Sequence, residues 1–323
     1  MLKPKVIIAR KIPKDGLDEL YKHCKVKMHA SQDPPTKKQL ISYAKSADAL
    51  MTTVTEEVDK DVLRANPDLK IVANYALGFN NIDLKSAKAR NVYASNTPSM
   101  MSASAVAQHA FALLFALARR LPQSDAFVKA GKYKAWSPVL FLGDDMREKT
   151  LGIVGGGRIG CSLAEFAKTC FDMKILYSDV VRSPQIEKKC KAKKVSLDSL
   201  LKESDYVSLH VPLLPSTKHL IGLKELSQMK ESAILINTSR GGVIDEKALV
   251  RTLRAKKIAG AGLDVFENEP KLSLGLAKLS NIILTPHTAS ATIEAREEMG
   301  RQATENILDV LIHGKAPRNE VKA

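Results

Sequence analysis

The sequence predicts an α/β protein built from two doubly wound, parallel-sheet domains, and two observations support this class. Short apolar segments that suit strands alternate with segments that suit helices along almost the whole chain. A glycine-rich turn, LGIVGGGRIG at 151–160, joins one such strand directly to one such helix. A length of 323 residues, with 45% hydrophobic and 26% charged residues, allows two globular cores.

The first part of the chain forms one predicted α/β unit that ends at Pro98. We expect strands at 6–9, 26–29, 49–53, 71–75 and 92–95. We expect helices between them at 16–23, 36–46, 59–65 and 81–90. This alternation predicts a parallel sheet, because parallel strands need crossover connections.

A helix at 104–119 follows, and it is apolar almost all round, so we expect it to be buried. A loop containing Pro122 and Trp136 then leads to a second unit that begins at Thr150. Its expected strands are 151–154, 173–177, 206–210, 233–237, 260–265 and 282–284. Its expected helices are 159–170, 197–203, 218–229 and 246–256.

The last helix, 293–313, comes after the final strand of the second unit and can return to the first unit. The predicted first domain is therefore discontinuous, 1–98 plus 290–323, and the second domain is 99–289. A cleft between two such units is the expected ligand site.

The glycine turn predicts a Rossmann-like dinucleotide site. Gly155 permits a tight turn, Gly157 lets a pyrophosphate approach the backbone, and Gly160 lets the helix pack against the strand. The helix N-terminus adds free N–H groups and a positive dipole end. Asp179 ends the next strand, where an acidic side chain can accept hydrogen bonds from an adenosine ribose.

The net charge of +15 is unusual, and a solvated lysine-rich surface explains it better than a site for nucleic acid or for an anionic substrate. Aromatic residues make up only 5% of the chain, and it has no zinc-finger or RNA-binding signature. The four cysteines have no metal-ligand spacing and are expected to be reduced, mostly buried thiols of a cytoplasmic protein. No metal site is expected. The longest apolar run, 110–118, is too short to span a membrane.

Three polar residues follow strands of the second unit: Arg240, Glu269 and His287. Ligands bind at the carboxyl ends of strands in such sheets. A guanidinium can hold a carboxylate and a carbonyl oxygen, an imidazole can exchange a proton near neutral pH, and a carboxylate can orient that imidazole. Each residue has a structural alternative, as a loop cap, a turn residue or a helix-start histidine. Together they favour carbonyl reduction.

The chain resembles the D-isomer-specific 2-hydroxyacid dehydrogenase family along essentially its whole length, and within it the glyoxylate and hydroxypyruvate reductases. The matching segments are ANYALGFNNID (73–83), SNTP (95–98), GIVGGGRIG (152–160), INTSRGGVID (236–245), GLDVFENEP (262–270) and TPHTASAT (285–292). FVKAGKYKAW, the FLG that follows and the N-terminal KPKVIIARKIP support the narrower resemblance.

The resemblance implies that His287 is the proton donor, that Glu269 supports it, and that Arg240 binds the 2-oxo acid. It implies that the Leu77–Gly78 turn presents N–H groups to the substrate carboxylate. Trp136 resembles an aromatic residue that reaches the active site of the neighbouring subunit, with a local core position as the equal alternative. The implied cofactor-binding residues are Gly155, Gly157, Arg158, Ile159, Gly160, Asp179, Val180, Val181, Val211, Pro212, Thr238, Ser239, Arg240 and Asp264.

Cofactor and substrate choice depend on two departures from related enzymes. Glyoxylate reductases that prefer NADP have a motif like Ser-Arg-x-Arg after the second strand of the dinucleotide-binding unit. In this chain Asp179 occupies the position of the first arginine, which favours NAD. Arg182 and nearby lysines keep NADP open as an alternative. Phosphite dehydrogenases carry a lysine where this chain has Leu77, which favours an organic 2-oxo acid over phosphite.

The predicted function is therefore NAD(P)-dependent, reversible hydride transfer between a small 2-oxo acid, glyoxylate or hydroxypyruvate, and the D-2-hydroxy acid, by a homodimer. Other D-2-hydroxyacid dehydrogenases, such as those for D-lactate or phosphoglycerate, and phosphite dehydrogenase remain alternatives. A cofactor-sensing protein like the corepressors that share this fold is the alternative from another class. It would bind cofactor with little turnover.

Overall fold

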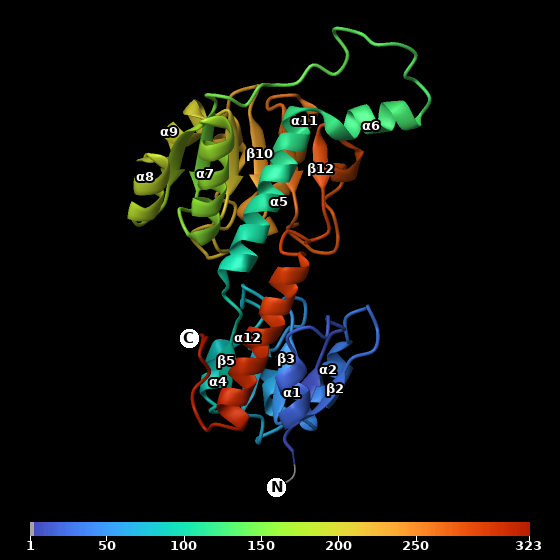
Figure 1. The fold of residues 1–323 in the computed structure, drawn as a ribbon, viewed down its shortest axis with the longest axis vertical. Helices are drawn as coiled ribbons and strands as arrows, with labels where there is room; N and C mark the ends of the chain where they lie inside the picture. Colours follow the sequence, from blue (N-terminus) through green and yellow to red (C-terminus); the bar gives the residue numbers. More distant parts are fainter. Residues whose placement is uncertain (1–2) are drawn as a thin grey trace. The chain divides into compact units, whose positions relative to one another are not determined.

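The computed structural model describes residues 3–323, which form two compact α/β units (Figure 1). Unit 1 comprises Met1–Ser102 and Ala291–Ala323, and unit 2 comprises Ala103–Ser290. The sequence predicts 1–98 plus 290–323 and 99–289 for the two domains. The parallel α/β class is confirmed, because every pair of neighbouring strands in both sheets runs parallel.

Unit 1 has a five-stranded sheet of order β2-β1-β3-β4-β5. Its strands are β1 (Lys5–Ile8), β2 (Lys25–Met28), β3 (Ala49–Thr52), β4 (Ile71–Asn74) and β5 (Tyr93–Ser95). Its helices are α1 (Asp18–His23), α2 (Lys37–Lys45), α3 (Lys60–Arg64), α4 (Leu84–Lys88) and the C-terminal α12 (Ile293–Leu311).

Alternate residues of β1 enter two cores on opposite faces of the unit 1 sheet. Ile7 packs in the core that α2, α3 and α4 cover, and Val6 and Ile8 pack with α1 and α12. The final helix therefore does return to the first unit, as Figure 1 shows for the red ribbon. Its approach is close: Thr304 Oγ1 donates to the Gly16 carbonyl at 3.1 Å.

Unit 2 has a seven-stranded sheet of order β12-β11-β10-β9-β6-β7-β8. Its strands are β6 (Thr150–Val154), β7 (Lys174–Ser178), β8 (Lys193–Lys194), β9 (Tyr206–Leu209), β10 (Ile234–Asn237), β11 (Gly260–Leu263) and β12 (Ile282–Leu284). Its helices are α5 (Met100–Ala118), α6 (Leu121–Lys129), α7 (Arg158–Phe171), α8 (Pro184–Cys190), α9 (Leu197–Glu203), α10 (Leu223–Leu226) and α11 (Glu246–Arg254), with 3₁₀ turns at Gly241–Val243 and Leu276–Lys278.

The unit 2 sheet is also covered on both faces. Ile153 packs with α5 and α7, whereas its neighbour Val154 packs with α9, α10 and α11. Helix α5 is long and apolar enough to cross a membrane by length and composition alone, but half of it is buried in the protein. Since the core helix of a globular domain passes the same test, this is weak evidence for a membrane span.

Three sequence-based expectations were wrong in detail. The expected helix at 218–229 is reduced to α10, because His219 has a left-handed φ of 51° and Ile221 pairs with Ile244 in an isolated parallel bridge. The helix at 81–90 begins only after Asp83, whose side chain accepts the Ser86 N–H as an N-cap. Helices α6 and α8 were not expected: α6 lies in the segment expected to be a loop, and α8 lies in a segment for which no helix or strand was predicted.

Gly157 and Gly160 of the glycine turn should differ in how much an added side chain destabilises unit 2. A Cβ at Gly160 would lie 2.3 Å from the Gly155 carbonyl oxygen, whereas a Cβ at Gly157 would meet nothing within 4 Å. We expect Gly160→Ala to lower the free energy of unfolding of unit 2 by about 1–3 kcal/mol through overpacking. Gly157→Ala is the control and should cost less than about 1 kcal/mol. Equal unfolding midpoints in urea for the two variants would contradict this assignment.

Candidate functional site

The glycine turn between β6 and α7 leaves its backbone accessible. Gly155 has a φ of +101°, and a Cβ there would lie 2.7 Å from the His210 carbonyl oxygen, so a side chain is excluded. Gly157 is the N-cap residue of α7 and faces open space. Arg158 and Ile159 form the first turn of this 14-residue helix. These features fit a bound pyrophosphate, which needs close backbone approach and unpaired N–H groups.

Asp179 lies beside the glycine turn, at the end of β7. Its Oδ2 accepts the Gly156 N–H at 2.8 Å, and its Oδ1 accepts the Val181 N–H at 3.2 Å. Val180 and Val181 are exposed. Each carboxylate oxygen has a further lone pair for a ligand hydroxyl, so the expected ribose contact is geometrically open.

The ends of β9 and β10 supply further cofactor candidates. Val211 and Pro212 follow β9, half-buried and exposed respectively. Thr238 follows β10, and its buried Oγ1 has no hydrogen-bond partner within residues 3–323. Ser239 instead donates its Oγ to Asn237 Oδ1 at 2.7 Å. A buried hydroxyl without a partner at a strand end is the kind of group that a bound ligand satisfies.

Arg240, Glu269 and His287 follow β10, β11 and β12, which are neighbours at one edge of the sheet. The structure brings them together. His287 Nδ1 lies 2.9 Å from Glu269 Oε2, and Arg240 is close enough to Glu269 to affect its ionisation. The side chains of His287 and Glu269 are about one-third exposed, at 34% and 37%, so they can reach a ligand.

The side chains of Arg240, Glu269 and His287 lie close enough to affect one another's charge. Burial raises the pKa of Glu269, but the His287 hydrogen bond and charge, the Phe266 N–H and the Arg240 charge outweigh burial and lower the pKa below its usual value. Burial lowers the pKa of Arg240, and Glu269 opposes this change. Glu269 is therefore a carboxylate, and Arg240 a cation, at neutral pH.

The His287 loop is held by the buried carboxylate of Asp264. This carboxylate accepts hydrogen bonds from Thr285 Oγ1 at 2.6 Å and from the Thr288 and Ala289 N–H groups at 2.8 Å. The Asp264 carbonyl accepts the His287 N–H at 2.9 Å. His287 itself has a left-handed φ of 55°. Asp264 was expected beside the nicotinamide, and it also shapes the loop that carries the histidine.

Sequence analysis missed His109 of helix α5. Its Nε2 lies 3.0 Å from Thr285 Oγ1 and 3.6 Å from Asp264 Oδ1. A histidine within an otherwise apolar helix was the only signal in the sequence, and nothing in its spacing connected it with 264 or 285.

The loops of Arg240 and Glu269 also contact each other. A Cβ at Gly241 would lie 1.8 Å from the Phe266 carbonyl carbon, so only glycine fits there. Glu267 links this contact to two further elements: its N–H donates to Glu246 Oε1 at 2.7 Å, and its Oε1 lies 2.7 Å from His219 Nε2. These contacts fix the backbone of both loops.

The unit 1 turn at Leu77–Gly78 is anchored by its carbonyl groups. The side-chain amide of Asn96 donates to the Leu77 carbonyl, and that of Asn74 donates to the Gly78 carbonyl, both at 2.7 Å. Within the described chain, the two N–H groups of this turn donate to no other group. They are available to an anionic ligand.

Trp136 lies between α6 and β6, and 79% of its side chain is exposed. A position in the local core, one of the two sequence-based alternatives, is therefore wrong. Its neighbours Val139 and Leu142 are also exposed.

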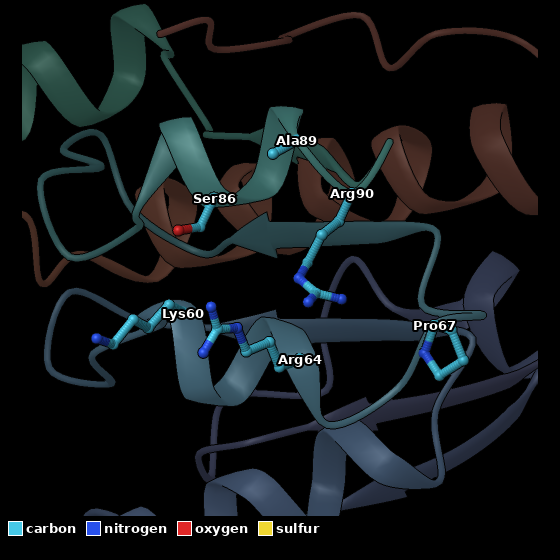
Figure 2. Close-up of a pocket in the computed structure, with 6 residues that line it drawn as sticks. All are labelled: Lys60, Arg64, Pro67, Ser86, Ala89 and Arg90. Carbon is cyan, nitrogen blue, oxygen red and sulfur yellow. The ribbon is translucent and has the colours of Figure 1, made fainter.

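A cavity of about 420 Å³ lies in unit 1 between α3 and α4 (Figure 2). Lys60, Arg64 and Arg90 line it, together with Pro67, Ser86 and Ala89. It contains none of the predicted site residues and adds nothing to the candidate site. No group of three or more His, Cys, Asp or Glu within residues 3–323 is placed to hold a metal ion.

A glycine turn on a doubly wound sheet, with arginine, glutamate and histidine at adjacent strand ends, defines the class of nicotinamide-dependent dehydrogenases. Residues 111–289 match the family model described as D-isomer specific 2-hydroxyacid dehydrogenase, NAD binding domain. The chain belongs to the D-isomer-specific 2-hydroxyacid dehydrogenase family and is an NAD(P)-dependent oxidoreductase.

Relatives and solved structures agree with this assignment. The chain is 47% identical over 324 aligned positions to a glyoxylate reductase of Thermococcus litoralis, covering 99% of this chain and 97% of that protein. A crystal structure of a protein from Thermus thermophilus has a TM-score of 0.92 at 38% identity, covering 98% and 99% of the two chains. An acyclic imino acid reductase in complex with NADPH and D-Arg has a TM-score of 0.86 at 31% identity, covering 98% and 99%.

His210, beside the glycine turn, makes stability depend on pH. Burial lowers its pKa to about 3 from 6.5, so the folded protein keeps it neutral. The unfolded chain binds a proton below pH 6.5 and the folded chain does not. Stability should therefore fall as pH drops from about 6.5 towards 3, by up to about 1.4 kcal/mol per pH unit.

Replacing His210 with Asn should flatten this dependence. Unfolding midpoints measured between pH 7.5 and 4.5 should then converge, whereas the exposed control His313→Asn should keep the original slope. An unchanged slope in His210→Asn would show that other groups cause the acid sensitivity.

Proposed function

We propose that this protein reduces glyoxylate or hydroxypyruvate to the corresponding D-2-hydroxy acid. One observation carries the proposal: the His287–Glu269 pair, with Arg240 beside it, lies at the strand ends of an NAD-binding domain. The relative at 47% identity, named glyoxylate reductase, supports the substrate class. Hydroxypyruvate rests on the sequence resemblance alone.

Each of the three residues has one chemical task in this proposal. Glu269 accepts a hydrogen bond from the Nδ1–H of His287 at 2.9 Å, and the protonated imidazole then donates its Nε2 proton to the substrate carbonyl oxygen. Arg240 binds the substrate carboxylate and carbonyl oxygen, and its charge stabilises the negative charge that develops on that oxygen. A nicotinamide cofactor, when bound, would supply the hydride for the carbonyl carbon. His287 then recovers its proton from solvent.

NAD is the proposed cofactor. Asp179 would accept hydrogen bonds from the adenosine ribose, and its charge would repel the 2′-phosphate of NADP. Its attachment to Gly156 at 2.8 Å supports this role, because it holds the carboxylate beside the glycine turn. Thr238 Oγ1, buried without a partner among the described residues, would bind the nicotinamide end.

Unit 1 is proposed to supply the substrate carboxylate site. The unpaired N–H groups of the Leu77–Gly78 turn support this, since two adjacent backbone donors suit an anion. Leu77 in place of a lysine favours an organic acid over phosphite.

Replacing His287 with Asn tests the proton transfer. Turnover should fall by about 10²–10⁴-fold, because the carbonyl oxygen loses its proton donor. The dissociation constant for NADH, measured by fluorescence titration, should change little. Normal turnover in this variant would contradict the proposed role of His287.

Replacing Arg240 with Lys should mainly raise the Michaelis constant for the 2-oxo acid, because the paired hydrogen bonds are lost.

One panel of initial rates tests the substrate. Glyoxylate, hydroxypyruvate, pyruvate and phosphite would each be measured against both cofactors, phosphite with the oxidised forms. We expect the highest kcat/KM for glyoxylate or hydroxypyruvate with NADH. Tight NADH binding without turnover of any substrate would instead support a cofactor-sensing protein.

A homodimer in the cytoplasm completes the proposal. The segment from α6 to β6 exposes Val128, Trp136, Val139 and Leu142, an apolar set that a second copy of the chain would cover. Light scattering should give about twice the chain mass of 35.3 kDa, and a single-chain mass would contradict the dimer. The free cysteines suit a reducing compartment, and recovery in the cytoplasmic fraction tests this.

A further inference from the structure

Arg182, the residue that kept NADP open in the sequence analysis, is already engaged in the structure. Its Nε lies 3.0 and 2.9 Å from the two carboxylate oxygens of Glu187, and its Nη2 lies 2.8 Å from Oε2. We propose that Glu187 is a second determinant of NAD preference, because it holds Arg182 away from the 2′-phosphate of NADP. This inference rests on the proposed cofactor site at Asp179.

Glu187 is itself fixed from the protein side. The buried Tyr177 hydroxyl donates to Glu187 Oε1 at 2.5 Å and accepts the Ser183 N–H at 3.0 Å. Ser183 Oγ in turn donates to the Gly156 carbonyl at 2.8 Å. The carboxylate that holds Arg182 is therefore connected by three hydrogen bonds to the glycine turn. Arg182 is mostly exposed, at 75%, whereas Glu187 is only 20% exposed, so the glutamate is the fixed partner.

The pKa directions agree with a charged pair. The Arg182 ion pair and the Tyr177 hydrogen bond lower the pKa of Glu187. A 2′-phosphate would need to take Arg182 from a carboxylate that offers the same paired acceptor geometry. The 2′-phosphate would also be repelled by the Asp179 carboxylate. Removing the charge of Asp179 alone should therefore give only part of the possible gain in NADPH affinity.

The chain offers a matched control. Glu165 and Lys189 form another ion pair in unit 2, at 2.8 Å, between α7 and α8. Glu165→Gln changes the net charge by the same amount as Glu187→Gln but leaves Arg182 paired. Glu187→Gln retains an acceptor oxygen for Tyr177, and Asp179→Asn retains one for the Gly156 N–H.

The experiment measures binding of NADH and NADPH by fluorescence titration, without substrate. The variants are Asp179→Asn alone and in combination with Glu187→Gln, with Glu165→Gln, and with Glu187→Gln plus Arg182→Gln. We expect Glu187→Gln to tighten NADPH binding about three- to tenfold beyond Asp179→Asn, since an exposed ion pair holds the arginine by about 1 kcal/mol. Glu165→Gln should have a much smaller effect, and Arg182→Gln should abolish the gain.

Displacement of bound NADH by adenosine 2′,5′-bisphosphate and by AMP isolates the phosphate contact. Only the bisphosphate should respond to Glu187→Gln. Equal gains with Glu165→Gln, or a gain that survives Arg182→Gln, would overturn the proposal. If Asp179→Asn unfolds the domain, the same comparison in the wild-type background should still show a gain that depends on Arg182, and its absence would count against the proposal. Failure of wild-type protein to bind NADH would instead overturn the proposed function.

Discussion

The geometry of the candidate site depends on the hydrogen bonds that the buried carboxylate of Asp264 accepts. A charge removed from water is costly unless it is paired or hydrogen-bonded. Asp264 meets this need with the Thr285 hydroxyl and with the Thr288 and Ala289 N–H groups. Those partners lie on both sides of His287, so satisfying the carboxylate also folds the histidine loop. One buried charge thereby connects the end of β11 to the loop after β12.

Parallel strands explain why three residues so distant in sequence can act together. Strands β10, β11 and β12 are adjacent and parallel, so their carboxyl ends lie at one edge of the sheet. Each loop then bends for its own reason: a glycine contact at Gly241, hydrogen bonds at Glu267 and the left-handed backbone of His287.

The glycine turn of the proposed cofactor site is likewise held by side-chain hydrogen bonds to its backbone. The glycine turn is held by Asp179 and Ser183, which bond the Gly156 N–H and carbonyl. The residues that would select the cofactor are therefore the residues that shape the phosphate loop. Asp179 contacts the glycine turn directly, whereas Glu187 reaches it only through Tyr177 and Ser183 and would act on the cofactor through Arg182.

The sequence by itself determined the α/β class, nearly every strand, the return of the last helix to the first unit, and the Arg240, Glu269 and His287 set, because alternation, glycine spacing and strand-end position are local signals. Only the tertiary structure decided that Arg182 is paired, that Trp136 is exposed, and that His109 meets Thr285 and Asp264. It also shortened the helix expected at 218–229, where a bridge from Ile221 to Ile244 competes with local helix propensity. The contacts of His109 and Ile221 join segments far apart in the chain, which no local pattern encodes. The Arg182–Glu187 pair spans only five residues, but it depends on helix α8, which the sequence did not predict.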